Sequence, residues 1–190
     1  MCKEIQGLVL LTSMDSSFVL DLKYATTDNF TKRIVYPIDA CILQKNTAKK
    51  LILANEEFKK EGYVLKIWDA YRPIYVQHMF WNMIQDRRFI ANPNIRPSRH
   101  NYGTAVDVTL VDANNVELQM PSKFDDFTER ASRKNENMAH IEKKNLDYLT
   151  EKMHKYGFIT IDTEWWHFED CDYAKYSLVD VQLEEFLSLD

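Results

Sequence analysis

The segment 104–111 (TAVDVTLV) constrains the fold more than any other, because it is the strongest β-strand pattern in the chain and carries an acidic residue near its centre. Side chains alternate between the two faces of a strand, so the apolar residues at even positions share one face and are expected to pack into the core. Asp107 lies on the other face, between the small residues Ala105 and Thr109. These small neighbours leave room for another group to approach the Asp107 carboxylate.

The rest of the chain interleaves strand and helix patterns. Strands are expected at 17–25, 63–68 and 158–161, and helices at 47–62, 73–86, 139–156 and, in short form, 180–188. Thr47 is expected to cap the first helix, and residues 119–138 are polar and loop-like. The spacing is too irregular for repeated βαβ units, so we expect an α+β fold with a mainly antiparallel sheet and flanking helices. Because no repeat or linker-like composition interrupts the chain, residues 1–190 are expected to form one domain.

The composition favours a protein that acts on small molecules or peptides. The formal net charge is -5 and no Lys/Arg block is present, so nothing points to nucleic acid or to an anionic membrane as a partner. The apolar stretch 8–11 is too short for a signal peptide, and no run reaches the roughly 18 apolar residues of a membrane helix. Cys2, Cys41 and Cys171 form no CxxC pair, which suits a reducing compartment. We therefore expect a cytoplasmic protein, with Cys41 and Cys171 as small packed residues.

Two histidines join Asp107 as candidate metal ligands. His100 lies shortly before Gly103, where the chain can turn and bring the imidazole back towards Asp107. The segment 162–169 (DTEWWHFE) offers His167 as a third ligand. Two histidines and one aspartate suit one Zn²⁺ per chain, because zinc accepts nitrogen and oxygen ligands and keeps a fourth position for water at catalytic sites.

Glu164 and Arg72 would complete a hydrolytic site. Zinc lowers the pKa of a bound water, and Glu164 can act as the general base that takes its proton. On a regular strand Glu164 and His167 would point to opposite faces, so we predict a bend or bulge near 163–165, or a place for Glu164 on the loop before the strand. Arg72, in WDAYRP, lies at a strand-to-helix junction, where a fixed cation could stabilise the oxyanion formed when water attacks a carbonyl. Asp69 is expected to support Arg72 or its loop.

None of these residues is diagnostic by itself. A single histidine is more often a hydrogen-bonded structural group than a metal ligand, and a single arginine is more often half of a salt bridge. His78, His140 and His154 fall on or near the expected helices without ligand spacing, and we interpret them as surface or satisfied residues. Only the combination of residues, in order, points to a catalytic metal site.

That combination resembles a known family. The segments SRHNYGTAVD (98–107) and EWWHFE (164–169), with DAYRP (69–73) upstream, closely resemble the D-alanyl-D-alanine dipeptidases of the VanX type, which belong to a larger group of zinc D,D-peptidases. The His-to-Asp spacing of seven and the Glu-to-His spacing of three both match, in the right order. The resemblance runs from about residue 19 to about Glu169, and so covers most of the chain.

The resemblance implies a zinc D,D-peptidase or hedgehog-like fold and zinc-dependent hydrolysis of the D-Ala-D-Ala dipeptide. It matches His100, Asp107 and His167 to the zinc ligands of the family. It also matches Glu164 to the catalytic base and Arg72 to the residue that stabilises the transition state.

Further matches concern the substrate. Ser98 matches a residue that contacts the substrate carboxylate, and Tyr24 matches a tyrosine of the substrate pocket. Asp125 matches the acid that receives the free ammonium of the substrate, with the adjacent Asp126 as the alternative. Pro121-Ser122 stands where the family usually has Gly-Thr, which bears on the shape of the pocket wall.

Other interpretations stay open. Among enzymes, the alternative is a D,D-carboxypeptidase or L,D-endopeptidase on cell-wall peptides; these act outside the cytoplasm, so the missing signal peptide argues against them. A non-enzymatic, hedgehog-like zinc-binding module is the alternative outside enzymes, but a purely structural site needs neither Glu164 nor Arg72. A metal-free globular protein is the third. The sequence leaves open a homo-oligomer and whether the role is antibiotic resistance, wall recycling or nutrition.

Overall fold

The strand around Asp107 lies in the middle of the larger of two sheets. The computed structural model describes residues 3–187. The larger sheet has the order β3 (Val19–Leu20), β5 (Val64–Asp69), β6 (Ala105–Val111), β8 (His167–Asp170) and β7 (Phe158–Thr160). β3 pairs in parallel with β5 and the other neighbours are antiparallel. Every residue of β6 is buried, as its central place and apolar sequence require.

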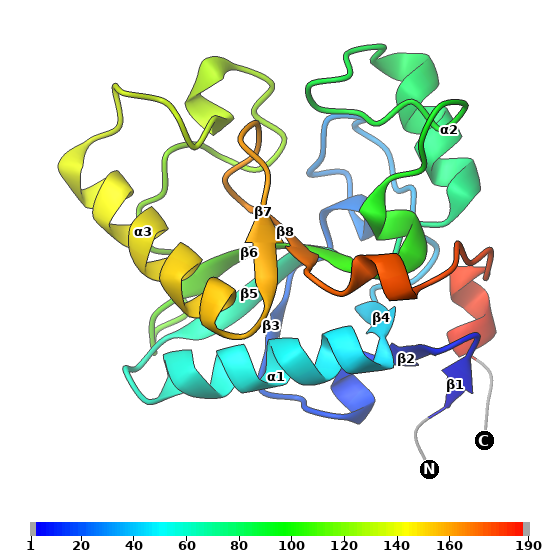
Figure 1. The fold of residues 1–190 in the computed structure, drawn as a ribbon, viewed down its shortest axis with the longest axis horizontal. Coiled ribbons are helices and arrows are strands. Elements are labelled where there is room, and N and C mark those ends of the chain that lie inside the picture. The colour runs from blue at the N-terminus through cyan, green and yellow to red at the C-terminus, as the bar shows by residue number, and fades with distance from the viewer. Residues whose placement is uncertain (1–2, 188–190) are drawn as a thin grey trace.

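A smaller sheet and three α-helices complete the fold (Figure 1). The smaller sheet is antiparallel and contains β1 (Glu4–Ile5), β2 (Leu8–Leu10) and β4 (Ile42–Gln44). The helices are α1 (Lys45–Lys59), α2 (Ile74–Met83) and α3 (His140–Lys155). The predicted α+β class with a mainly antiparallel sheet is confirmed. That residues 1–190 form one domain stays a prediction.

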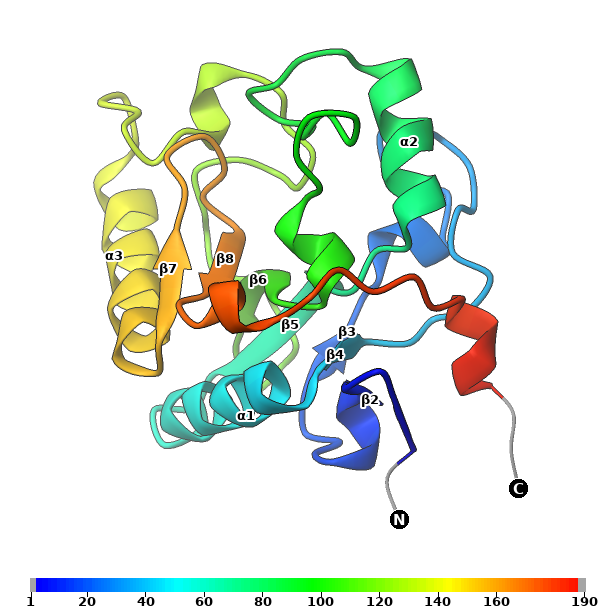
Figure 2. The same cartoon turned by 45° about the vertical axis from the view of Figure 1, so that its right-hand side comes forward.

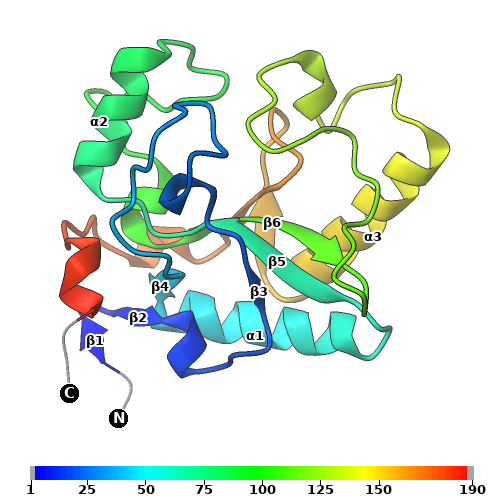
Figure 3. The same cartoon turned by 180° about the vertical axis from the view of Figure 1, so that it is seen from behind.

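The hydrophobic core has two parts, and the helices divide between them. α1 and α3 lie together on one side of the larger sheet, and their apolar residues join those of β5 and β6 in the first cluster (Figures 1 and 3). The apolar face predicted for the central strand, with Val106, Val108 and Leu110, belongs to this cluster. α2 stands apart from the other two helices (Figure 2) and contributes Val76 and Phe80 to the second cluster.

Several element boundaries differ from the sequence expectations. Thr47 does not cap α1, which begins two residues earlier; its hydroxyl instead donates a hydrogen bond of 2.7 Å to Asp170. α2 ends at Met83 rather than near residue 86, and the expected strand 17–25 is a two-residue strand followed by a 3-10 helix. The expected C-terminal helix is a 3-10 helix at Leu183–Phe186, and Ser188 lies outside the described residues.

The cysteines and the histidines outside the candidate site mostly lie where the sequence placed them. Cys41 is buried as expected, but Cys171 is exposed, so its assignment as a packed residue was wrong. Cys2 lies outside the described residues. The surface interpretation is confirmed for all three remaining histidines, His78, His140 and His154. Within residues 3–187, no helix combines the length and apolar character needed to cross a bilayer.

Gly103 forms the turn between the 3-10 helix Arg99–Tyr102 and β6. It ends the 3-10 helix Arg99–Tyr102 in the left-handed conformation, with φ +68°. Its carbonyl accepts a hydrogen bond of 2.9 Å from the Gln44 amide, which ties this turn to the smaller sheet. The reversal at Gly103 therefore brings His100 back over the start of β6, as the sequence suggested.

Replacing Gly103 with alanine should destabilise the fold more than the same change at Gly62. Both residues have a left-handed backbone, but a Cβ at Gly103 would lie 2.4 Å from Leu8 Cδ2 and 3.2 Å from the Gln44 nitrogen, whereas one at Gly62 meets nothing within 4 Å. We expect the free energy of unfolding to fall by about 1 kcal/mol for Gly62→Ala and by about 2–4 kcal/mol for Gly103→Ala, since only the latter adds overpacking. Urea denaturation measures both; equal losses would contradict the close packing.

Candidate active site

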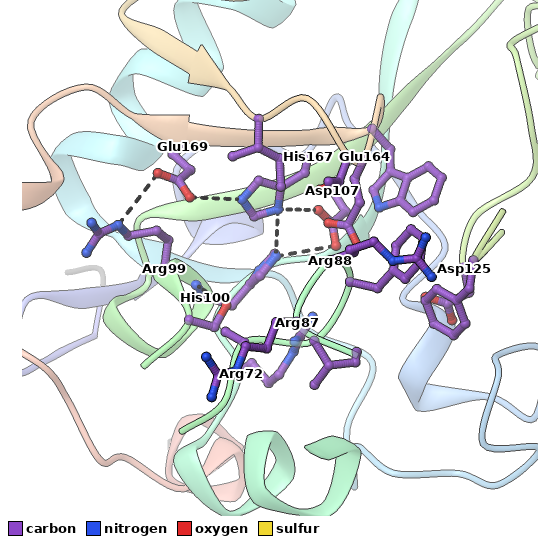
Figure 4. A pocket seen from close by; sticks show the side chains of 18 of the residues that line it. Arg72, Arg87, Arg88, Arg99, His100, Asp107, Asp125, Glu164, His167 and Glu169 are labelled. Carbon is purple, nitrogen blue, oxygen red and sulfur yellow. Dashed lines mark hydrogen bonds and ion pairs between the residues drawn. The ribbon is translucent and has the colours of Figure 1, made fainter. Parts of the chain in front are cut away.

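Three side chains meet at one end of the larger sheet (Figure 4). His100 comes from the 3-10 helix Arg99–Tyr102, Asp107 from β6 and His167 from the first position of β8, where it is the direct cross-strand partner of Asp107. His167 Nδ1 lies 3.0 Å from Asp107 Oδ1 and 3.2 Å from His100 Nε2. All three residues are buried, and their facing atoms lie within 4.8 Å of one another. The structure therefore brings together the three residues expected to bind a metal.

The hydrogen bonds of the outer ring nitrogens determine which nitrogen of His100 and of His167 offers a lone pair to the point between the three residues. His100 Nδ1 lies 2.7 Å from the Ala70 carbonyl oxygen, which can only accept, so Nδ1 carries the proton and Nε2 presents a lone pair. His167 Nε2 lies 3.3 Å from Glu169 Oε1, and a proton there leaves the Nδ1 lone pair pointing inward. Two nitrogen lone pairs and the Asp107 carboxylate thus converge on one point, a donor set that fits a divalent cation.

The electrostatics at this point favour positive charge. Burial lowers the pKa of His167, but hydrogen bonds to Asp107 and Glu169 outweigh it and raise that pKa to about 10. Burial likewise acts to raise the pKa of Asp107, yet the facing His100 and His167 hold it well below its usual range. Without a metal, His167 therefore binds a second proton at Nδ1, facing Asp107; a bound cation would replace that proton and be stabilised by the same acidic groups.

Glu164 lies beside these residues on the turn that precedes β8, not on the strand itself. The predicted irregularity is therefore confirmed, and both Glu164 and His167 line the same pocket. Burial raises the pKa of Glu164 above its ordinary value. Within the described part of the chain, no hydrogen bond holds its carboxylate. A carboxylate with a raised pKa and without a hydrogen bond from the described residues is suited to accept and release a proton.

Arg72 lies between the end of β5 and the start of α2 and is only 6% exposed. Its Nη2 and Nε donate to Asp69 Oδ2 at 2.6 and 3.1 Å, and its Nη1 donates to Gln77 Oε1 at 2.9 Å. Its backbone nitrogen also donates to the His100 carbonyl oxygen at 3.1 Å. These bonds fix the guanidinium at the wall of the pocket, and Asp69 has the supporting position expected from the sequence.

Asp125 lies at another part of the pocket and has an unusual backbone. Its φ is 57°, which is uncommon for a residue other than glycine. Oδ1 accepts a hydrogen bond of 3.0 Å from the Tyr24 hydroxyl and Oδ2 one of 3.3 Å from the Phe30 amide. Burial raises the pKa of Asp125 to about 7. Asp126 instead accepts from the Thr128 amide and lies outside the pocket lining, so the structure separates the two candidates.

The remaining lining of the pocket was partly missed by the sequence reasoning. Ser98 was expected there; its Oγ accepts a hydrogen bond of 3.3 Å from the His100 amide. Glu169 and four arginines line the same cavity of about 240 Å³ and were not singled out: Arg87, Arg88, Arg96 and Arg99. Glu169 follows His167 by two residues and so shares its face of β8, which is the one pattern that could have indicated it.

Asp125→Asn should stabilise the protein at high pH and not at low pH. The pKa of Asp125 is higher in the folded protein than its ordinary value of 3.8, so the folded state loses stability as pH rises from about 4 to about 7. Asparagine tolerates the same backbone and carries no charge. We expect a gain of about 1–3 kcal/mol at pH 8 and almost none at pH 4. Chemical denaturation at both pH values measures this; an equal effect at both would contradict a raised pKa of Asp125 in the folded protein.

Comparison with known proteins identifies the family of this chain. Residues 4–188 match the family model described as D-ala-D-ala dipeptidase. The D-alanyl-D-alanine dipeptidase of Escherichia coli (strain K12) is 33% identical over 95% of this chain and 93% of the relative, and that of Enterococcus faecium is 32% identical over 85% and 90%. The LdcB LD-carboxypeptidase, a solved structure, is a looser match, with a TM-score of 0.48 and 20% identity over 97% of this chain and 78% of that one. The chain belongs to the D-Ala-D-Ala dipeptidase family of peptidases.

Proposed function

We propose that this chain is a zinc-dependent dipeptidase that hydrolyses D-Ala-D-Ala or a close relative. The observation that carries the proposal is the convergence of two imidazole lone pairs and the Asp107 carboxylate beside Glu164 and Arg72 in one pocket. The curated relatives bear the name of that activity.

One zinc ion per chain would be held by His100, Asp107 and His167. Zinc suits two nitrogen ligands and one oxygen ligand, and three protein ligands are the usual number at catalytic zinc sites. When bound, zinc lowers the pKa of water and polarises a carbonyl group. The buried carboxylate of Asp107 also offsets part of the charge of a divalent ion.

Glu164 acts as the general base and then as the general acid. Its carboxylate takes a proton from the attacking water and returns one to the leaving amine. Because no side chain of the described residues holds it by a hydrogen bond, the carboxylate loses no bond within the protein when it accepts a proton. The raised pKa of Glu164 lies closer to the pKa values of the water and the amine between which Glu164 moves the proton.

Arg72 stabilises the negative charge that develops on the carbonyl oxygen. Asp69 and Gln77 hold the guanidinium through three hydrogen bonds, so it does not have to reorganise as the charge develops. A cation that is pre-oriented in a buried site acts more strongly than the same cation in water.

The two ends of the substrate would meet different partners. Asp125 would receive the free ammonium, with Tyr24 orienting its carboxylate, and Ser98 would contact the free carboxyl group. A peptide extended at its amino end places an amide where the ammonium is expected, so the half-buried Asp125 carboxylate would be left without its ion pair. This cost gives the small cavity a preference for dipeptides.

The alternatives are weaker on the same geometry. A non-enzymatic zinc module needs neither the proton acceptor Glu164 nor the fixed Arg72, yet both line the pocket with the three proposed ligands. A carboxypeptidase substrate carries no free ammonium at this position, so it would leave the half-buried Asp125 without a charge partner. Action in the cytoplasm, a lack of nucleic-acid and membrane partners, and a possible homo-oligomer stay predictions.

Glu164→Gln and His100→Ala should separate proton transfer from metal binding. We expect Glu164→Gln to bind one zinc per chain and to lose activity by about 10²–10⁴-fold, because the amide cannot accept the proton. His100→Ala should lose both zinc and activity, because a ligand is gone. Metal analysis of the purified proteins and amine release from D-Ala-D-Ala measure both properties. Near-normal turnover by Glu164→Gln would show that the base is wrongly assigned.

Acetylation of the substrate's amino group should abolish hydrolysis, because it removes the ammonium that Asp125 is proposed to bind. With zinc-loaded protein we expect turnover of D-Ala-D-Ala, but not of L-Ala-L-Ala or N-acetyl-D-Ala-D-Ala. The acetylated peptide fails because it has no ammonium for the half-buried Asp125 carboxylate. Asp125→Asn should raise the KM for D-Ala-D-Ala and reduce the discrimination against the acetylated peptide. Equal cleavage of the free and acetylated peptides by the unaltered protein would favour a carboxypeptidase instead.

A further inference from the structure

Glu169 and Arg99 lie against the metal-ligand group on the side away from Asp125, and the mechanism above gives neither of them a part (Figure 4). We propose that they act as a positioning pair that fixes the His167 imidazole as a metal ligand. This inference rests on the metal site of the proposed function. It assigns neither residue a contact with the reacting atoms.

The first contact joins Glu169 to the outer nitrogen of His167. The two residues are two positions apart on β8, so their side chains share one face of the strand. Glu169 Oε1 lies 3.3 Å from His167 Nε2, and Glu169 is only 7% exposed. A buried carboxylate here keeps the imidazole proton on Nε2, which leaves Nδ1 free to face the centre.

The second contact holds Glu169 from the opposite side. Arg99 Nε lies 3.6 Å from Glu169 Oε2, and the Arg99 guanidinium stacks on the Tyr173 ring at 3.7 Å from its centroid. Arg99 Nε is buried and, within the described residues, has no hydrogen bond of its own, so the facing carboxylate is its charge partner. Stacking on Tyr173 fixes the plane of the Arg99 guanidinium, which faces Glu169 Oε2. The other carboxylate oxygen, Oε1, is therefore left to face His167 Nε2.

The pair also connects the two segments that carry the histidine ligands. Arg99 precedes His100 on its 3-10 helix, whereas Glu169 follows His167 on β8. An Arg99–Glu169 contact therefore limits how far the two imidazoles can separate. The outer nitrogen of His100 is oriented by a backbone group, the Ala70 carbonyl at 2.7 Å, and the Asp69 carboxylate lies farther from it, at 3.8 Å. The outer nitrogen of His167 instead meets a side chain, Glu169, that can be replaced.

Outer partners of this kind raise the basicity of a ligand histidine and fix its ring, and their loss usually lowers metal affinity by about 10–100-fold. A residue with a purely structural role would instead change the stability of the metal-free fold and leave the intrinsic zinc affinity unchanged. Zinc affinity and metal-free stability, measured on the same variants, therefore separate the two roles.

The test is the zinc dissociation constant of the full chain, measured by competition with a chromophoric chelator at pH 7. We expect Glu169→Ala to raise it about 10–100-fold. Glu169→Gln should raise it less, because the amide oxygen still accepts from His167 Nε2, and Arg99→Gln should also have a smaller effect, because Glu169 remains. Asp162→Ala is the matched control: it removes an exposed acid that pairs with Lys134 near β8, and should leave the constant unchanged.

The outcomes distinguish this inference from the proposed function. If the unaltered chain binds no zinc, the proposed metal site itself fails. If it binds one zinc and both Glu169 variants bind it equally tightly, the positioning role is overturned while the metal site stands. If Glu169→Ala does not fold, Glu169→Gln and Arg99→Gln carry the test, and unchanged zinc affinity in both overturns the inference. Graded affinities with an unchanged urea midpoint of the metal-free protein support it.

Discussion

The site depends on a row of charged side chains that crosses the larger sheet. Asp69 on β5, Asp107 on β6 and His167 on β8 are successive cross-strand partners, so three polar groups lie side by side in a buried sheet. Two neighbouring carboxylates repel each other unless each has a partner. Arg72 and the Tyr36 hydroxyl, at 2.7 Å, pair with Asp69, which leaves Asp107 to the imidazoles. These pairings separate the guanidinium of Arg72, beside Asp69, from the three proposed metal ligands, which include Asp107.

The central strand and its neighbours could be predicted because their patterns are local. The apolar alternation of 104–111 identified β6, and two-residue periodicity showed that Glu164 and His167 could share a site only if the chain left the strand between them. Thr47 shows where local reasoning fails. It has the composition of a helix cap, but its hydroxyl is used by the buried Asp170, more than a hundred residues away. The residues around Thr47 therefore could not indicate a hydrogen-bond partner so distant in sequence.

The parts of the site that the sequence missed or left undecided are those that depend on tertiary contacts. Arg99 owes its orientation to Tyr173 and Glu169, and nothing in the spacing of these residues indicates that they meet. Asp125 and Asp126 are adjacent acids that the sequence could not separate. In the fold Asp125, with its left-handed backbone, accepts from the Tyr24 hydroxyl and lines the pocket, whereas Asp126 accepts from the Thr128 amide. The resemblance to known dipeptidases supplied these two candidates, but the fold was needed to choose between them.

Rigid and irregular elements contribute different properties to the pocket. The proposed ligands and Arg72 come from strands, a short helix and the junction after β5, where backbone hydrogen bonds fix their positions. Asp125 and the arginines at 87, 88 and 96 come from irregular segments outside the sheet. Loop residues can be replaced at lower cost to the core than residues of a buried strand. The proposed metal ligands are therefore fixed by the sheet and its neighbouring elements, whereas Asp125 and these arginines lie on segments that can change without disturbing the sheet.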